Sequence, residues 1–320
     1  MQLVEYSSSK QALGGTIQLT FVSDISRHNA EELFKSLWRE VLYFEKRFSR
    51  FLLSSELSRF NTKAGVKTPV SQEFRTVLLT AKACATQTGD LYNPFILPAL
   101  QRAGYKGSAM KGYENDRVPD YSERQVVESS RLEIGDNWAL IPRGSAIDLG
   151  GMGKGYLADQ LGNKLRSMKK ISGYWLDLSG DIATYGKRAD WQPISVGIQD
   201  GREISKKRTD VIIVCPSEPF GIATSGTFRR GNQSQDAVRH HIINPKTGQS
   251  AQTDVMLATV CAKSALQADV LASCGVIVGS SATSALFSKH KLLGWMVQYK
   301  TNTGKIREQV QGAFIQEQLV

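Results

Sequence analysis

The alternation of apolar and polar residues predicts both strands and helices along the chain. Residues 16–22 carry apolar side chains at every second position, which is the period of a strand. Residues 30–48 and 73–87 carry them three and four positions apart, which predicts helices with one buried face. Residues 264–278 form the most apolar stretch with helical spacing. The first part of the chain therefore mixes both kinds of element, and an apolar helix follows near the end.

The remaining pattern completes an α+β interpretation. Residues 132–141, LEIGDNWALI, predict a hairpin with its turn at 135–137, and the polar residues 101–130 predict a surface excursion. Further strands are predicted at 174–185, 194–199, 211–215 and 295–299, and a further helix carries Leu157, Leu161, Leu165 and Met168 on one face. Because strands and helices come in blocks rather than in strict alternation, we expect an α+β fold. We expect one domain over residues 1–320, which could have two lobes.

The chain has 320 residues, 41 % of them apolar, and a net charge of +10. A positive net charge suggests nucleic-acid binding as a hypothesis, because lysine and arginine bind phosphates. The basic residues are dispersed, runs such as Lys206-Lys207-Arg208 are short, and no recognition motif accompanies them. A solvated basic surface, or attraction to one anionic ligand, explains the charge equally well, and we expect no nucleic-acid partner.

The four cysteines are scattered without a CxxC pair, which argues against a zinc site or a disulfide framework. We expect reduced, packed thiols. The first twenty residues show no signal-peptide pattern, and no stretch reaches the roughly 18 apolar residues of a membrane span. We expect a cytoplasmic protein as the sequence is written, or a periplasmic or lipid-anchored one if a leader has been removed.

The stretch AIDLGGMGKGYLADQL (146–161) combines a glycine run with the start of a predicted helix. Bare backbone N–H groups and a helix N-terminus suit an anion such as phosphate. Residues 153–158 also match the loose dinucleotide pattern GxGxxA. The preceding strand is short and polar and no βαβ succession follows, so we disfavour a dinucleotide site. The alternative is that the glycines serve a tight turn and close helix packing.

Asp269 and Ser273 lie one helical turn apart in an otherwise apolar predicted helix. A carboxylate in such surroundings needs a partner or a cation. Carboxylate, hydroxyl and carbonyl oxygens suit a hard ion such as Mg²⁺. A structural aspartate with hydrogen-bond partners remains the alternative.

Two other segments carry candidate chemistry. His240 and His241 precede a turn of the sequence NPKTG, and adjacent histidines in a strand point to opposite sides, so at most one would face a site. The segment TSGTFR (224–229) combines hydroxyls, a glycine and an arginine, which could contact an anion or form a polar loop.

Seven segments, in this order, resemble motifs of the FAD:protein FMN transferases, the ApbE-like flavin transferase family. They span most of the chain: FSRFLLSSELSRFN (48–61), TGDLYNPFILPAL (88–100), DLGGMGKGYLAD (148–159), LDLSGDIATYG (176–186), ATSGTFRR (223–230), HHIINPKTG (240–248) and ADVLAS (268–273). Each segment alone is a weak signal, whereas seven in register are specific. The resemblance implies mixed, largely antiparallel sheets packed with helices in a T-fold-like architecture.

The resemblance also implies an activity and a set of site residues. Members bind FAD and Mg²⁺ and transfer FMN to a threonine or serine hydroxyl of a target protein through a phosphoester bond, releasing AMP. By position, Asp148 and Lys154 would contact FAD, and the Gly151 carbonyl, Asp269 and Ser273 would bind Mg²⁺. Further FAD positions are Leu13, Phe51, Leu91, Tyr92, Asn93 and, through its backbone, Ile243. Asp269 or His241 would accept the proton of the attacking hydroxyl.

The chain departs from the family pattern at several of these positions. Ser273 replaces the usual threonine and keeps the hydroxyl, while Leu13 and Phe51 replace a common methionine and tyrosine. Ser179 and Asn244 replace a usual glycine and aspartate. None of these departures removes a proposed metal ligand. Two other functions stay open at this point, an FAD pyrophosphatase that yields FMN and AMP, and a non-catalytic FAD-binding protein.

Overall fold

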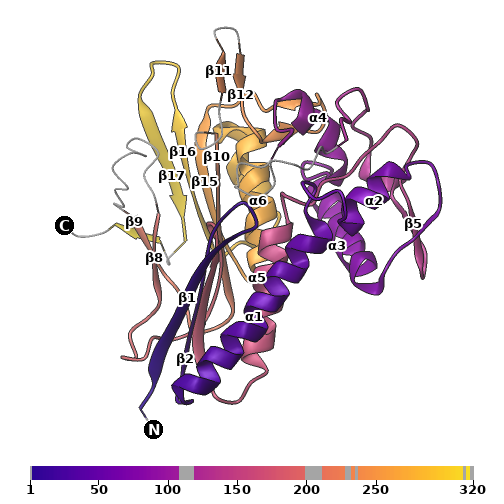
Figure 1. Cartoon of the computed structure of the whole chain (residues 1–320). Coiled ribbons are helices and arrows are strands. Elements are labelled where there is room, and N and C mark those ends of the chain that lie inside the picture. Colours follow the sequence, from indigo (N-terminus) through magenta and orange to yellow (C-terminus); the bar gives the residue numbers. More distant parts are fainter. Residues whose placement is uncertain are drawn as a thin grey trace. The chain divides into compact units, whose positions relative to one another are not determined.

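The protein is described by a computed structural model, which covers residues 2–107, 119–198, 211–227, 232–234, 237–312 and 315–317 (Figure 1). The chain forms two compact units that are interleaved in sequence. Unit 1 comprises Met1–Leu42, Gly153–Gly226 and Thr253–Val320, and unit 2 comprises Tyr43–Met152 and Thr227–Gln252. The expectation of a single domain over 1–320 stays a prediction.

Unit 1 is built on an eight-stranded sheet with the strand order β1-β2-β6-β7-β10-β15-β16-β17. Every neighbouring pair in this sheet is antiparallel. The strands are β1 (Val4–Ala12), β2 (Gly15–Ser23), β6 (Ile171–Leu178), β7 (Asp181–Gly186), β10 (Phe220–Gly226), β15 (Val255–Ala262), β16 (Gly294–Lys300) and β17 (Ile306–Gln311).

The two faces of this sheet are covered by different elements. Helices α5 (Gly153–Arg166) and α6 (Ala265–Val278) pack on one face, as Figure 1 shows. The other face packs against the small sheet of β8 (Ser195–Ile198), β9 (Val211–Val214) and β18 (Ile315–Glu317). Side chains alternate along a strand, so Ile182 of β7 joins the apolar cluster with β8 and β9, whereas Asp181 points to the helical face.

Two tight hairpin turns lie at the same end of the unit 1 sheet. Leu13 and Gly14 join β1 to β2, and Ser179 and Gly180 join β6 to β7, all four with positive φ. A Cβ on Gly15 would lie 2.2 Å from Ser179 Oγ, so the two turns touch. The prediction of one strand over 174–185 is therefore wrong: the chain reverses at Ser179-Gly180, a two-residue turn whose positive φ values match the twist of a hairpin.

Unit 2 is formed mainly by short helices and strands. Helix α1 (Arg27–Phe48) begins in unit 1 and ends in unit 2. The core of unit 2 contains the ring pair of Phe60 and Phe74, with centroids 5.4 Å apart. Its other elements are α2 (Glu56–Thr62), α3 (Gln72–Thr88), η1 (Pro94–Ile96), α4 (Leu97–Arg102), η2 (Ser129–Arg131), β3 (Thr68–Pro69), β4 (Glu133–Ile134), β5 (Trp138–Leu140), β11 (Asn232–Ser234), β12 (Ala237–Arg239), β13 (Ile243–Asn244) and β14 (Gln249–Ser250).

The long periodic elements agree with the sequence predictions. The predicted strand at 16–22 is β2, and the predicted helices at 30–48, 73–87 and 264–278 are α1, α3 and α6. The predicted hairpin at 132–141 is β4–β5. All four cysteines are buried and free, as expected. Part of the 101–130 excursion, Gln199, residues 206–208 and the Phe228-Arg229 pair lie outside the described residues.

Several elements were not predicted, among them β1, β10, β15 and helix α7 (Ser280–Ser288).

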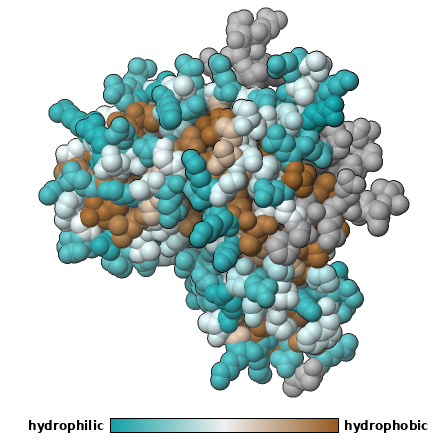
Figure 2. Space-filling view, turned by 180° about the vertical axis from the view of Figure 1, so that it is seen from behind, coloured by the Kyte–Doolittle hydropathy of each residue, from teal (hydrophilic) through white to brown (hydrophobic). Residues whose placement is uncertain are grey.

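Among the described residues, no helix has both the length and the apolar character needed to cross a membrane. The face in Figure 2 is largely hydrophilic, with separate hydrophobic groups rather than one continuous patch.

Candidate active site

The close contact between α5 and α6 depends on Gly155. A Cβ at this position would lie 2.5 Å from the backbone oxygen of Ala265 and 2.9 Å from Asp269 Cβ. Real side-chain atoms do not approach so closely, so only glycine fits here without a shift of the helices. Without a side chain, the Gly155 N–H can also donate a hydrogen bond to Asp269 Oδ2 at 3.2 Å. Gly155 thus serves close helix packing, and α5 begins inside the glycine run at Gly153 without a preceding strand.

Asp269 is a buried carboxylate on the inner side of α6, with 5 % of its surface exposed. Burial raises the pKa of this carboxyl, while the nearby Lys154 ammonium and the Gly155 N–H oppose the rise. A cation placed beside the carboxylate would offset the same desolvation. Asp269 is therefore suited to bind a positive charge.

Lys154 forms an ion pair with Asp181, the first residue of β7. The Asp181 side chain is only 6 % exposed, whereas the Lys154 side chain is 27 % exposed. Lys154 immediately precedes Gly155 on α5, and its charge also acts on Asp269. The Lys154 ammonium thus interacts with two buried carboxylates. Nothing in the sequence singles out Asp181, because an aspartate after a turn resembles an ordinary turn residue.

Ser273 lies one turn after Asp269 on α6, as the spacing predicts, and its Oγ lies 2.9 Å from Ser225 Oγ of β10. The two hydroxyls share a hydrogen bond in which either can donate. Each hydroxyl oxygen has two lone pairs, so Ser273 Oγ retains acceptor capacity toward a cation. Unit 1 thus contributes a carboxylate and a hydroxyl from one face of α6.

Asp159 on α5 binds the start of α6. Its two carboxylate oxygens accept hydrogen bonds from the backbone N–H groups of Ala265, at 2.8 Å, and Leu266, at 2.9 Å. Burial raises the pKa of Asp159 to about 6, although these N–H groups oppose the rise. Asp159 is part of the DLGGMGKGYLAD segment and was not selected from the sequence. Its bonds identify it as a residue that fixes α5 and α6 to each other.

In unit 2, Asp148 is held by Arg50 and by the Gly150 N–H. Asp148 Oδ1 lies 3.0 Å from Arg50 Nη1, and Asp148 Oδ2 accepts a hydrogen bond from the Gly150 N–H at 2.9 Å. Both partners of the ion pair are largely buried. Asp148 therefore holds the glycine turn and the Arg50 guanidinium in place. Its predicted contact with FAD stays a prediction.

Phe51 and Tyr92, two positions assigned to FAD, lie beside other candidate residues of unit 2. The Arg50 guanidinium lies 4.5 Å from the centre of the Phe51 ring, which is a cation–π distance. A Cβ on Gly151 would lie 3.5 Å from Tyr92 Cε2, which is ordinary van der Waals contact. Gly151 has no positive φ and no steric crowding that would require a glycine, whereas steric crowding requires the glycine at 155.

The neighbouring positions Leu91 and Asn93 differ in exposure. Leu91 is partly exposed, whereas Asn93 is buried. The Asn93 side chain accepts a hydrogen bond from the Phe95 N–H at 2.8 Å and donates one to the Val127 carbonyl at 2.9 Å. Its amide thus holds the start of η1, and any contact with FAD would have to use its remaining hydrogen-bonding capacity.

The two adjacent histidines lie between β12 and β13 rather than within a strand, and they differ in environment. His240 is buried and its Nε2 lies 2.9 Å from the Ala251 carbonyl, while its Nδ1 accepts a hydrogen bond from the Ile242 N–H at 3.3 Å. Burial lowers the pKa of His240, so it is a neutral structural residue. His241 is partly exposed, and its ring meets the Tyr105 ring with centroids 5.9 Å apart. Only His241 can face a ligand.

The last two predicted positions are Ile243 and Leu13. Ile243 is a buried residue of β13 that packs with Ala99 and Leu100 of α4 in unit 2. Its side chain is thus occupied in the core, which leaves the backbone for a ligand contact. Leu13 occupies the β1–β2 turn with φ 54°, and is partly exposed. Lys154, Asp269, Ser273 and Leu13 belong to unit 1, and the other predicted site residues belong to unit 2.

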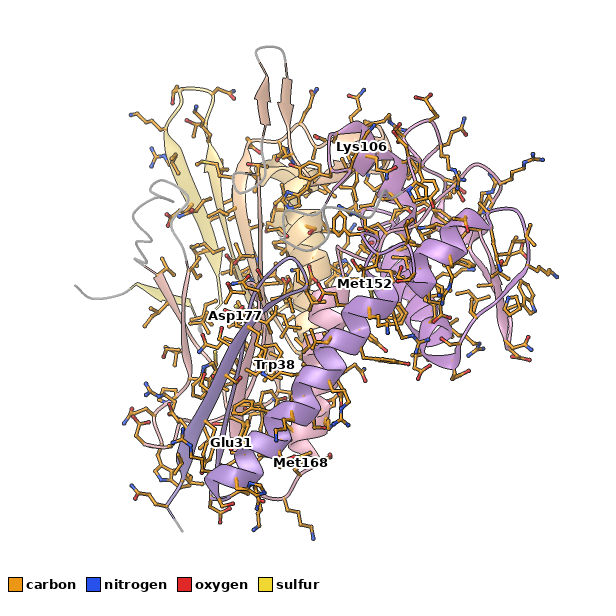
Figure 3. All side chains as sticks on the ribbon, in the orientation of Figure 1. Glu31, Trp38, Lys106, Met152, Met168 and Asp177 are labelled. Carbon is orange, nitrogen blue, oxygen red and sulfur yellow. The ribbon has the colours of Figure 1, made fainter. Side chains whose placement is uncertain are left out.

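Within the described ranges, no group of three or more histidine, cysteine, aspartate or glutamate residues is arranged to bind a metal. A groove of about 500 Å³ lies between β1 and the first half of α1 in unit 1, and Glu31 and Trp38, labelled in Figure 3, belong to its lining. None of the predicted site residues lines this groove. The candidate site is therefore defined by its side chains rather than by this groove.

A model of the ApbE family matches residues 13–295. This chain belongs to the ApbE family. Among curated relatives of this ApbE-family chain, the FAD:protein FMN transferase of Haemophilus influenzae is 23 % identical over 310 residues, which are 93 % of this chain and 87 % of the relative. The FAD:protein FMN transferase of Vibrio cholerae is 27 % identical over 304 residues, covering 92 % and 88 % of the two chains.

Solved structures of other ApbE proteins share the fold. The flavin transferase ApbE from Vibrio cholerae superposes with a TM-score of 0.79 at 24 % identity, covering 98 % of each chain. The flavinyl transferase ApbE of Pseudomonas stutzeri, in its apo form, gives a TM-score of 0.79 at 20 % identity, covering 98 % of this chain and 96 % of the other. The predicted α+β fold with largely antiparallel sheets is thus confirmed.

Proposed function

We propose that this protein transfers the FMN half of FAD to a serine or threonine hydroxyl of a target protein and releases AMP. The observation that carries the proposal is the pair of buried carboxylates, Asp181 and Asp269, beside one lysine at the start of α5. Membership in the ApbE family and relatives named FAD:protein FMN transferases support the same activity.

The residues of unit 1 fit a divalent cation. Asp269 is buried and offers carboxylate oxygens as ligands, and Ser273 presents a hydroxyl from the same face of α6. Hard oxygen donors of this kind suit Mg²⁺, which usually keeps part of its shell for phosphate and water. We assign the third protein ligand of Mg²⁺ to the carbonyl of Gly151. A bound Mg²⁺ would neutralise the pyrophosphate and stabilise the negative charge that develops on the departing AMP.

The protein's own groups would supply position and proton transfer. Lys154, on a flexible stem beside Asp269, would bind phosphate oxygens of FAD. The hydroxyl oxygen of the acceptor would form a bond to the phosphorus of the FMN half as the bond to the bridging oxygen breaks, and AMP would leave with that oxygen. The hydroxyl proton would go to Asp269 or to His241. The acceptor surface itself is encoded in another chain.

The other assigned FAD contacts belong to the proposal in the same way. Phe51 offers an aromatic ring, and the adjacent Arg50 guanidinium adds positive charge beside it. Tyr92 adds a second ring next to Gly151. Leu13, Leu91, Asn93 and the Ile243 backbone complete the set, together with Asp148. Flat rings and a planar cation are suited to stack on the two ring systems of FAD.

The experiment follows FAD by chromatography in the presence of Mg²⁺ and a panel of purified flavoproteins with exposed threonine or serine residues. We expect AMP to appear together with flavin fluorescence on one acceptor that survives denaturation. Asp269→Asn should abolish both products. Free FMN in place of bound flavin would indicate the pyrophosphatase activity, and FAD binding without AMP would indicate a non-catalytic flavin-binding protein.

A further inference from the structure

We propose that Asp181 is a positioning residue, which holds the Lys154 ammonium away from the Asp269 carboxylate and thereby leaves Asp269 open to a divalent cation. This inference rests on the proposed cation site at Asp269. It assigns a role to a residue outside the set carried over from the family resemblance.

Among the residues that the structure describes, the charges near the start of α5 are unbalanced. Asp181 and Asp269 expose 4 % and 5 % of their surfaces, and one ammonium, that of Lys154, acts on both. The neighbouring Asp159 adds a further negative charge that acts on Asp269. The Asp159 oxygens are already bonded to two backbone N–H groups of α6. Since buried charges need compensation, the two remaining carboxylates call for more positive charge than Lys154 provides.

Asp181 is well placed to fix the ammonium because its backbone is rigid. It is the first residue of β7 and pairs with Ala223 of β10, inside the eight-stranded sheet. Lys154, by contrast, carries its charge on a flexible four-carbon stem. A carboxylate on a rigid backbone therefore fixes the position of an ammonium on a flexible side chain. In this protein the ion pair forms with Asp181.

The alternative partner for the ammonium is Asp269. Gly155, the residue after Lys154, already donates its N–H to Asp269 Oδ2, so the start of α5 lies directly against this carboxylate. If Asp181 lost its charge, the partly buried ammonium would gain most by pairing with Asp269. A divalent cation would then have to displace this pair before it could bind.

The test measures Mn²⁺ binding to the whole protein without FAD, by electron paramagnetic resonance. We expect Asp181→Asn to weaken Mn²⁺ binding by about tenfold or more, since the cation would have to displace an ion pair of opposite unit charges in contact. Lys154→Met should bind Mn²⁺ more tightly than wild type. The double variant should bind as tightly as Lys154→Met, because no ammonium is left to compete. Asp190→Asn, which removes an exposed charge from the turn after β7, should bind like wild type.

The same measurements contain the results that would overturn the inference. An equal loss in the wild-type and Lys154→Met backgrounds would make Asp181 a cation ligand rather than a positioning residue. Unchanged binding in Asp181→Asn would remove its role altogether. Asp181→Glu keeps the carboxylate and should bind Mn²⁺ like wild type, which guards against a general loss of folding in Asp181→Asn.

Asp269→Asn separates this inference from the proposed function. If Asp269→Asn leaves Mn²⁺ binding unchanged, the proposed cation site itself is wrong. If it abolishes binding while Asp181→Asn has no effect, only the inference about Asp181 fails.

Discussion

At the scale of single residues, neighbouring glycines of the 146–161 stretch have different surroundings. Gly150 donates its N–H to Asp148, Gly151 has room for a side chain beside Tyr92, and Gly155 lies against the backbone of α6. The sequence presents all of them as one glycine run. The role of Gly155 could not be predicted because it depends on Ala265 and Asp269, more than a hundred residues later.

The first prediction concerns these glycines. Gly155→Ala should destabilise the protein by about 1–3 kcal/mol, because the added Cβ would overlap the backbone of α6 and push the helices apart. Gly151→Ala is the matched control and should change the free energy of unfolding by less than about 0.5 kcal/mol, since its Cβ fits beside Tyr92. Urea denaturation measures both. Equal stability of the two variants would show that α5 and α6 do not need their close contact.

A second prediction concerns the buried pair of Arg50 and Asp148. Asp148→Asn should destabilise the protein by about 3 kcal/mol, because it leaves the Arg50 charge buried without its carboxylate. Adding Arg50→Met should recover part of this loss, since the uncompensated charge is then gone. Denaturant unfolding of the two single variants and the double variant tests this. Strictly additive losses would mean that the two side chains do not stabilise each other.

At the scale of elements, the N-terminus of α6 is held by a residue of another helix. Asp159 accepts the Ala265 and Leu266 N–H groups, so α5 acts as a cap for α6. A negative charge at a helix N-terminus is also favoured by the helix dipole. This arrangement holds Asp269 opposite Gly155. The sequence did not indicate it, because Asp159 and Ala265 belong to different predicted elements.

The pH dependence of stability should report the burial of the Asp159 carboxyl. Burial raises the pKa of Asp159 to about 6 in the folded protein, from 3.8. The folded state therefore binds this proton more tightly than the unfolded state, and the contribution of Asp159 to stability is present at low pH and is lost as pH rises from about 4 to about 6. Asp159→Asn should lose that part of the pH dependence. Urea titrations from pH 4 to pH 7 measure it, with the exposed Asp136→Asn as control; the same slope in wild type and Asp159→Asn would contradict the assignment.

Element predictions succeeded for the clearest apolar periods, and they missed several other elements, among them the buried strand β15. Helices α1, α3 and α6 and strand β2 carry clear apolar periods and were predicted from them. Strand β1, VEYSSSKQA, is an edge strand with mostly exposed polar residues, so it lacks an apolar face. The prediction of one strand over 174–185 missed the hairpin β6–β7, because its turn consists of only two residues, Ser179 and Gly180. The φ values that define this hairpin turn cannot be derived from residue propensity or from the hydrophobic period.

At the scale of the whole molecule, the chain passes repeatedly between two compact units. The break between Met152 and Gly153 falls inside the glycine stretch, with Gly151 in unit 2 and Lys154 in unit 1. The family resemblance was confirmed over residues 13–295, and the fold it implied was confirmed by the structural matches. The hydrophobic periodicity alone predicted only the α+β class. The roles of Gly151, Asp269 and Ser273 in metal binding remain predictions.

The central claim is that the protein cleaves FAD by passing FMN to a hydroxyl of another protein. The most direct measurement incubates the protein with FAD, Mg²⁺ and a candidate acceptor and quantifies AMP, free FMN and flavin that stays on the acceptor after denaturation. We expect equal amounts of AMP and acceptor-bound flavin with little free FMN, and neither product with Asp269→Asn. Unchanged turnover in Asp269→Asn, or FAD that binds and stays intact with every acceptor, would contradict it.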